Sequence, residues 1–366
     1  MTITAGELYT NDSTPSGDVV INGGLLAMYG SYDQITGNIT DTAAGTMYVG
    51  SDRIAVVGTI NLTASDLEIE GGADLTATSV TVATAASIVA VNGSGEPREI
   101  IGPVTLNAGG TLDMSVDDED FTITGDWTCT GSTITWHAAG RLIVAGNIVN
   151  ASLATTLAGS KAIRMTGASK TLEWRDYDNA GRMALTIAAG ATISSTTAIY
   201  CISFATEAAS VYTASSSAVD VCYAGNNMVD IQGTYTGNLQ LRSNWNLSSS
   251  NSGRVAASGD LTVLGTGAST ITQSGEFSVG GLLLYGVGDG WTSTYILSGA
   301  APVVGDTVLG VVTGAKNRGG ILTFSGAGSA TMGSLSGAAS STANEFNMGP
   351  RQITMASGAA WDGTDI

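Results

Sequence analysis

One pattern of apolar and polar positions recurs along the chain: an apolar residue, any residue, a second apolar residue, any residue, and then glycine. Alternating apolar positions predict a β-strand with one buried face. The glycine predicts a tight corner or a close backbone approach directly after the strand. The pattern begins at Val19, Leu67, Phe121, Leu142, Ile163, Val229, Leu261, Phe277 and Leu322, and a variant begins at Leu185 and ends at Gly190.

The spacing of these strands predicts how they are arranged. The starting positions Phe121, Leu142, Ile163 and Leu185 are almost equally spaced, and Val229 follows after twice that interval. One turn of a solenoid cannot bury its own apolar face, but stacked turns can. We therefore predict an all-β fold, a single-stranded parallel β-helix or β-solenoid with turns of about 21 residues. A tandem β-sandwich is the alternative, because frequent turn signals also suit that architecture.

The predicted organisation has three parts. Residues 1–18 form an N-terminal cap or particle-attachment segment, residues 19–284 form the solenoid, and residues 285–366 supply the terminal turns, a cap and oligomer contacts. Such covers are expected because the last turn of a solenoid otherwise leaves a sheet edge exposed.

Two local similarities give finer predictions of register. The stretch TLNAGGTLDMSV at 105–116 resembles TIAAGATISS at 186–195. The distance between the two copies is slightly short of four turns at this period, so we expect a shorter turn or a register slip between them. Cys201 and Cys222 are one predicted period apart and are expected to lie above one another in adjacent turns, as buried thiols or, alternatively, as a disulfide.

Composition limits the classes of function. Charged residues make up 12% of the chain, and the formal net charge is -18. Nucleic acid is not expected as a partner, because phosphate binding requires clustered Lys and Arg. No secretory signal or apolar stretch long enough to span a membrane is present in the sequence, so membrane insertion is not expected. No metal-binding or nucleotide-binding spacing occurs, His137 is the single histidine, and no cofactor is predicted.

Two polar stretches could carry chemistry. Asp117, Asp118 and Asp120 form an acidic run that could bind Ca²⁺, although an acidic run in a turn is usually only solvated. The second stretch contains Glu173, Trp174, Arg175, Asp176, Tyr177 and Asp178. Its aromatic and charged side chains suit a subunit interface or contact with a glycan, and Glu173 with Asp176 or Asp178 could form the carboxylate pair of a glycosidase.

Two tryptophans near the end of the chain complete the predicted contact residues. Trp291 follows the sequence GVGDG, and Trp361 lies close to the last residue of the chain. Because tryptophan concentrates in interfaces, we expect these side chains to cover the last turn, to make oligomer contacts or to contact a glycan.

The short turns TLNAGGTLDMS and LTIAAGATISS, the abundance of Thr, Ser and Gly, and the scarcity of Lys resemble parallel β-helix proteins of bacteriophage virions, which include capsid-decorating proteins, tail fibres and tailspikes. The resemblance implies a non-enzymatic structural protein that self-associates, with a homotrimer favoured, and that contacts other virion proteins and a host surface glycan. It implies a virion protein made in the host cytoplasm. The alternatives are a tailspike-type protein that binds or cleaves glycans, and a bacterial adhesin at the cell surface.

Overall fold

The computed structural model describes residues 1–50, 54–91, 96–116, 118–150, 152, 154–175, 182–214, 219–223, 228–243, 248–313, 316–338 and 344–358. These residues form strands, turns and bends, and no helix. The chain divides into two compact units. The first comprises residues 1–186 and 191–193, and the second comprises residues 187–190 and 194–366. Each unit is a stack of solenoid turns, called coils below.

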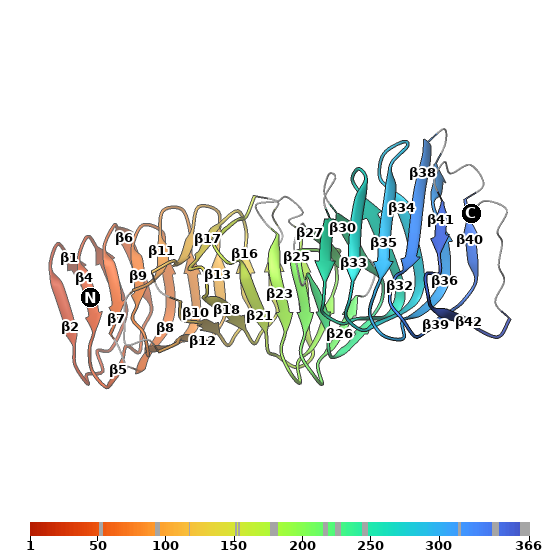
Figure 1. Cartoon of the computed structure of the whole chain (residues 1–366). Helices are drawn as coiled ribbons and strands as arrows, with labels where there is room; N and C mark the ends of the chain where they lie inside the picture. Colours follow the sequence, from red (N-terminus) through yellow and green to blue (C-terminus); the bar gives the residue numbers. More distant parts are fainter. Residues whose placement is uncertain are drawn as a thin grey trace. The chain divides into compact units, whose positions relative to one another are not determined.

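In the first unit each complete coil contributes three strands, and the equivalent strands of successive coils pair in parallel (Figure 1). Stack 1 contains β1 (Thr2–Thr4), β3 (Val19–Asn22), β6 (Ile39–Ala43), β13 (Val104–Leu106), β16 (Trp127–Cys129), β19 (Ile148–Asn150) and β22 (Lys170–Trp174). Stack 2 contains β2 (Glu7–Thr10), β4 (Leu25–Met28), β7 (Thr46–Val49), β9 (Asp66–Ile69), β11 (Ser87–Ala90), β14 (Thr111–Met114), β17 (Thr133–Trp136) and β20 (Thr156–Ala158). Stack 3 contains β5 (Tyr32–Gln34), β12 (Arg98–Ile101), β15 (Phe121–Ile123), β18 (Arg141–Val144), β21 (Ala162–Met165) and β23 (Met183–Ile187). The longer strands β8 (Ile54–Leu62) and β10 (Asp74–Val82) pass from stack 3 into stack 1.

The pairing registers confirm the predicted fold class. Phe121 pairs with Leu142, and Leu142 pairs with Ile163, so the predicted interval corresponds to one coil here. Among the described strand pairs with a defined register, only β37–β38 is antiparallel. A tandem β-sandwich is built from antiparallel sheets, so that alternative does not describe this chain. The described residues of the two units together form about 14 coils of a parallel β-helix.

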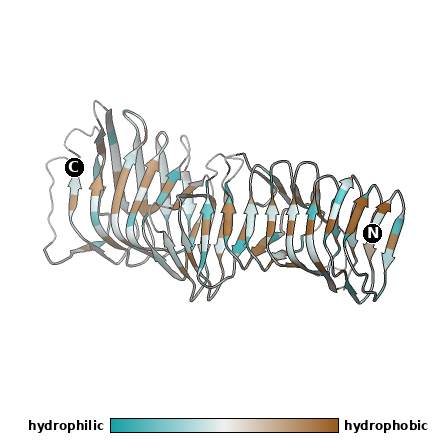
Figure 2. Cartoon of the chain, turned by 180° about the vertical axis from the view of Figure 1, so that it is seen from behind, coloured by the Kyte–Doolittle hydropathy of each residue, from teal (hydrophilic) through white to brown (hydrophobic). Residues whose placement is uncertain are grey.

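Alternation along each strand produces the core. In stack 2 alternate side chains point inward, and one of them from each coil forms a continuous aliphatic column, namely Leu26, Met47, Leu67, Ile88, Leu112, Ile134 and Leu157, all at most 3% exposed. Their neighbours in sequence point outward, as Thr111, Thr133 and Thr156 do in paired positions. Figure 2 shows this alternation of hydrophobic and hydrophilic positions along the strands. Burial of each large aliphatic side chain contributes about 1.5–3 kcal/mol.

Glycine occupies the corner between stack 3 and stack 1 in most coils of the first unit. This glycine corner consists of Gly17, Gly37, Gly58, Gly102, Gly125 and Gly146. A Cβ atom on Gly58 would lie 2.5 Å from the carbonyl oxygen of Gly37, and one on Gly146 would overlap the backbone of Gly125. The backbones of successive coils therefore approach too closely for a side chain at these positions, which explains the glycine after the predicted strands that begin at Phe121 and Leu142.

Asp and Asn side chains connect the coils at the same corner. The Asp126 Oδ1 atom accepts a hydrogen bond from the backbone N–H of Asn147 at 2.8 Å. The Asn147 Oδ1 atom in turn accepts from the backbone N–H of Thr171 at 2.9 Å. Each side chain satisfies a backbone donor of the following coil at the point where the strands are interrupted, so the corner stays hydrogen-bonded.

The two similar sequence copies occupy different corners. TLNAGGTLDMSV joins β13 in stack 1 to β14 in stack 2, whereas TIAAGATISS joins β23 in stack 3 to β24 (Thr192–Ser195), which pairs with β22 of stack 1. The expectation of a shorter turn or a register slip between equivalent positions was therefore wrong. Several corners of the coil require the same small residues, and similar sequences arise at each of them.

The second unit repeats the coil with longer strands. Its remaining strands are β25 (Ile199–Thr206), β26 (Val211–Ala214), β27 (Val219–Tyr223), β28 (Val229–Ile231), β29 (Thr234–Thr236), β30 (Leu239–Ser243), β31 (Ser248–Asn251), β32 (Val255–Gly265), β33 (Ser269–Gln273), β34 (Phe277–Gly286), β35 (Thr292–Leu297), β36 (Val303–Leu309), β37 (Val311–Thr313), β38 (Lys316–Phe324), β39 (Ser329–Met332), β40 (Leu335–Gly337), β41 (Glu345–Asn347) and β42 (Gln352–Met355). Glycine again recurs from coil to coil, at Gly237, Gly259, Gly280, Gly305 and Gly333.

The predicted register of the cysteines differs from the observed one by one residue. Cys201 pairs with Val221, and Cys222 pairs with Arg242. The coil here is one residue shorter than the predicted period, as the pairing of Ile199 with Val219 shows. The prediction from a constant period was therefore wrong at this place, because coil length varies locally.

Solenoid strands lie on both sides of the predicted domain boundaries. Strands β1 and β2 lie within residues 1–18 and pair with β3 and β4. Strand β34 runs across residue 284, and β35 to β42 follow it. The division between the two compact units falls near residue 190.

We predict that Gly146→Ala lowers the free energy of unfolding by about 1–3 kcal/mol, because the added methyl group overlaps the preceding coil. Gly6→Ala is the matched control, since a Cβ atom at Gly6 would meet only the Thr4 carbonyl oxygen, at 3.6 Å. Urea denaturation of both variants measures the difference. Equal stability of the two variants would contradict the close approach of the coils.

Asp41 gives a prediction for pH dependence. Burial raises the pKa of its carboxyl group, but hydrogen bonds from the Ala64, Thr63 and Ser65 backbone amides and from the Thr63 hydroxyl outweigh burial, so the net pKa is lowered. A lowered pKa stabilises the fold above the unfolded value of about 3.9, and that contribution is lost as the pH falls through the folded value. Asp41→Asn should be less stable than wild type near neutral pH, and the difference should shrink below about pH 4. Urea midpoints across this range test the prediction, and a difference that does not vary with pH would contradict it.

Candidate functional site

Glu173 and Trp174 lie on β22, but only Glu173 is at the surface, where a contact residue must lie. Trp174 is fully buried and packs against Trp127, with the ring centroids 5.9 Å apart. The prediction that Trp174 contacts a glycan or a subunit was therefore wrong, because alternation along β22 turns Leu172 and Trp174 inward and Glu173 outward. Asp176, Tyr177 and Asp178 lie outside the described residues.

Glu173 and Arg175 remain at the surface and pair with each other. The Arg175 Nε atom lies 2.7 Å from Glu173 Oε1. Because alternate positions of a strand point to the same side, this ion pair follows directly from the local sequence. The carboxylate proposed for acid–base chemistry is thus bound by a neighbouring cation.

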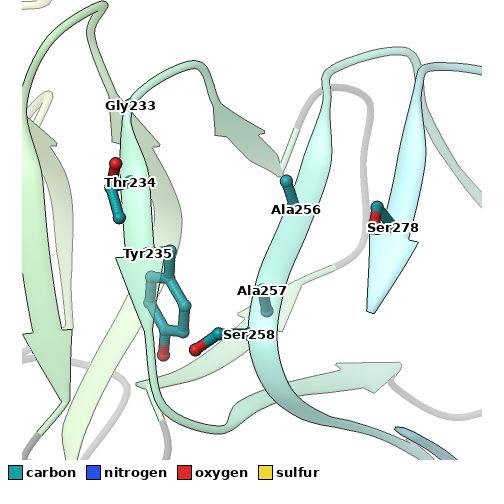
Figure 3. A pocket seen from close by; sticks show the side chains of 7 residues that line it. All are labelled: Gly233, Thr234, Tyr235, Ala256, Ala257, Ser258 and Ser278. Carbon is teal, nitrogen blue, oxygen red and sulfur yellow. The ribbon is translucent and has the colours of Figure 1, made fainter. Parts of the chain in front are cut away.

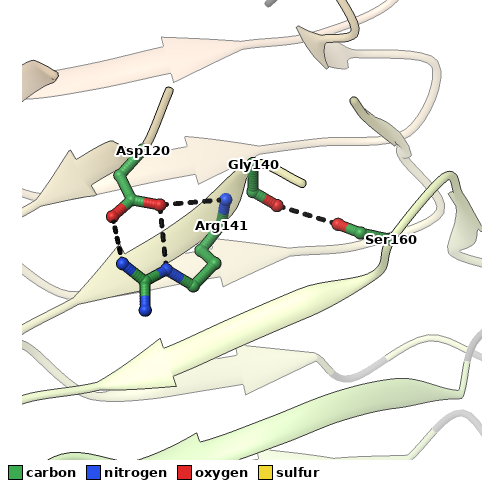
Figure 4. Close-up of polar contacts among 4 residues, drawn as sticks. All are labelled: Asp120, Gly140, Arg141 and Ser160. Carbon is green, nitrogen blue, oxygen red and sulfur yellow. Dashed lines mark hydrogen bonds and ion pairs between the residues drawn. The ribbon is translucent and has the colours of Figure 1, made fainter. Parts of the chain in front are cut away.

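The acidic run before β15 also makes an ion pair, in this case between coils. Asp120 accepts hydrogen bonds from Arg141 Nε at 3.0 Å and from Arg141 Nη2 at 2.7 Å (Figure 4). Asp118 is exposed, and Asp117 lies outside the described residues. Among the residues that the structure describes, no group of three or more His, Cys, Asp and Glu side chains could hold a metal ion. Asp120 of this run therefore has a structural partner in the next coil.

Of the two C-terminal tryptophans, only Trp291 lies within the described residues. Trp291 is partly exposed, and its indole ring lies over Gly288, where an added Cβ atom would come within 2.5–2.7 Å of ring atoms. The ring thus covers the turn between β34 and β35. Trp361 lies outside the described residues.

A shallow hollow on the second unit is lined by Gly233, Thr234, Tyr235, Ala256, Ala257, Ser258 and Ser278 (Figure 3). Tyr235 is 3% exposed, and its hydroxyl donates to the Asn238 carbonyl oxygen at 2.6 Å. The lining residues carry hydroxyl, methyl and backbone groups and no carboxylate, imidazole or thiol. This set can form hydrogen bonds with a ligand but offers no acid or base near neutral pH.

The first coils carry an exposed aromatic cluster that the sequence analysis missed. We call Tyr9, Tyr29 and Tyr48 the tyrosine patch. The Tyr9 and Tyr29 rings are stacked with centroids 5.9 Å apart, and the Tyr29 and Tyr48 centroids are 5.2 Å apart. Tyr9 is 55% and Tyr29 43% exposed. The sequence separation between successive members of the patch is close to one coil, so applying the predicted period to tyrosine would have found them.

Carboxylates accept hydrogen bonds from two of the hydroxyl groups of this patch. The Tyr9 hydroxyl donates to Glu7, and the Tyr48 hydroxyl donates to Glu70, each at 2.5 Å. The hydrogen bond to Glu7, with a smaller contribution from burial, raises the pKa of Tyr9. Burial, together with the hydrogen bond to Glu70, raises the pKa of Tyr48 far above its ordinary value. Both phenols therefore stay protonated and remain donors to the carboxylates.

We predict that Asp120 and Arg141 are coupled by about 0.2–1 kcal/mol, because Arg141 is half exposed and water screens the pair. A double-mutant cycle with Asp120→Asn and Arg141→Met, measured by thermal unfolding at low and high salt, should show a coupling that salt weakens. Added Ca²⁺ should leave the melting temperature of the wild type unchanged. A rise in melting temperature that Asp120→Asn abolishes would show instead that the carboxylate binds the metal.

Comparison of the chain with protein-family models, with curated proteins and with solved structures gave no match. In the described part of the chain, no helix is long and apolar enough to cross a membrane. Any statement about function therefore depends on the fold and the surfaces described above.

Proposed function

We propose that this protein is a non-enzymatic structural component of a phage-type virion, exposed on the particle surface and self-associating, with a homotrimer as the favoured assembly. The observation that supports this proposal is that both units consist of stacked parallel coils. A protein of this design provides a scaffold with a repeating surface, because each coil contacts mainly its neighbours.

The outer faces of the coils suit this role. In stack 2 of the first unit, paired outward positions carry hydroxyl side chains, such as Thr111, Thr133 and Thr156. Hydroxyl rows on a pleated surface are neutral and hydrogen-bond with water or with a second such surface. Few of these positions carry the flexible lysine side chains that oppose side-by-side packing through their entropy.

The rival function, that of a tailspike-type protein that cleaves glycans, receives less support from the same structure. Its proposed aromatic residue, Trp174, is buried, and its proposed carboxylate, Glu173, pairs with Arg175 at 2.7 Å. Glycan binding elsewhere on the surface stays compatible with a structural protein of a virion.

Sedimentation velocity on the full chain and incubation with bacterial surface polysaccharides together test the proposal. We expect a stable species of about three times the 36.7 kDa chain mass, and no oligosaccharide released by either wild type or Glu173→Gln. A monomer at all concentrations would contradict self-association. Oligosaccharide release that Glu173→Gln abolishes would contradict a non-enzymatic role. Capsid and tail genes on both sides of its gene would support placement in a virion.

A further inference from the structure

We infer that the tyrosine patch, with the carboxylates beside it, is a docking surface for a basic segment of a partner protein. The inference goes beyond the proposed function and does not depend on it. It rests on the position, the charge and the hydrogen bonding of the outer face of stack 2 in the first coils.

The centre of this face is apolar. In register, Tyr9 pairs with Ala27, and Ala27 pairs with Tyr48, so the three side chains share the outer face. Tyr29 follows β4, and its ring lies between those of Tyr9 and Tyr48. Ala27 is fully buried although it points outward, which indicates that the rings cover it. Leu25, one outward position earlier, is half-buried.

Two of the three most exposed aromatic rings in the described residues, Tyr9 and Tyr29, belong to this face, and the third, Tyr32, lies outside it on β5. The exposed large hydrophobic residues among those that the structure describes are Met1, Tyr9, Tyr29, Tyr32, Ile101, Val116, Val303, Val308 and Met348. The aromatic members of this set all lie in the first coils, none of them beyond Tyr32 in the sequence. Clustered exposed aromatic surface marks sites of interaction more often than scattered apolar residues do.

The rim of the face is acidic. Glu7 lies two residues before Tyr9, and Asp66 and Glu68 occupy the outward positions of β9 in the coil next to Tyr48. Glu70 accepts the Tyr48 hydroxyl. Residues 1–70 contain nine Asp and Glu and one Arg, which is Arg53. A cationic partner therefore complements this surface, because charge complementarity speeds association and excludes acidic competitors.

The hydrogen bonds at the patch favour a donor-rich ligand. The Tyr9 and Tyr48 hydroxyl hydrogens are already donated to Glu7 and Glu70, so these groups present only acceptor oxygens and ring π electrons to a ligand. Guanidinium and ammonium groups carry only donors, bind carboxylates strongly and stack on aromatic rings. The hydroxyl groups of a neutral saccharide need hydrogen-bond donors as well as acceptors on the protein, so a saccharide complements this surface less well.

A hollow beside the patch provides room for an extended segment. It is lined by Ala5, Gly6, Glu7, Gly23, Gly24, Leu25, Gly45 and Thr46. Its floor is glycine because the coils approach closely there: a Cβ atom on Gly45 would lie 2.5 Å from the Gly24 carbonyl oxygen. Glu7 and Leu25 belong both to this hollow and to the tyrosine face, so the two form one continuous surface.

The test uses the full chain and a fluorescently labelled hexa-arginine peptide, with binding measured by anisotropy. Tyr29→Leu keeps an apolar cover over Ala27 but removes the π face, and Glu70→Gln removes one charge of the rim. Each change should weaken peptide binding about five-fold. The matched controls are Tyr32→Leu, at another exposed tyrosine, and Asp289→Asn, at an exposed carboxylate of the second unit. Both should bind the peptide within about two-fold of wild type.

Two results would overturn the inference. The first is wild-type affinity of Tyr29→Leu, or equal losses in the patch variants and the controls, since the peptide would then bind the acidic protein without using this surface. The second is a neutral hexasaccharide that shifts the tyrosine ring resonances of the wild type in NMR spectra while the peptide does not. The NMR titration needs no variant, so the inference stays testable even if Tyr29→Leu fails to fold.

Discussion

Parallel hydrogen bonding between successive coils is the interaction on which the rest of this structure depends. Strands of adjacent coils must lie about 4.8 Å apart to form these bonds, and this spacing applies at the corners as well as along the strands. Side chains at most corners must therefore be small or absent. The glycine corner of the first unit meets this requirement, since a Cβ atom on Gly58 would lie 2.5 Å from the preceding coil.

The same constraint explains the unusual composition. A short strand supplies one or two inward side chains, and these form the aliphatic columns of the core. The outward positions stand in rows in which like charges would lie close together and repel. Threonine, with a β-branched side chain and a hydroxyl group, fits such rows. Glycine, threonine and alternating aliphatic residues are thus the expected result of repeating one coil.

Several polar side chains form hydrogen bonds or ion pairs between successive coils. Asp126 and Asn147 each accept a backbone N–H of the following coil, and Asp120 pairs with Arg141 of the next coil. The tyrosine patch is built by the same rule, because its three rings come from three successive coils. Residues one coil apart in the sequence become neighbours. A surface site of this fold is therefore built from residues of successive coils rather than from consecutive residues of the chain.

The sequence by itself determined the alternation of inward and outward side chains, the period of the coil and the need for glycine at its corners, because these features depend on local geometry that every coil repeats. Tertiary structure decided the length of each coil and the corner that each segment occupies. It placed Cys201 opposite Val221 and TIAAGATISS at a different corner from its near copy. It also put Arg98 into an inward position opposite Phe121, where its guanidinium donates to the carbonyl oxygens of Ile69 and Val91. These outcomes depend on the number of residues that each corner accommodates and on the backbone groups that the neighbouring coils present. The residues of a single coil determine neither of these.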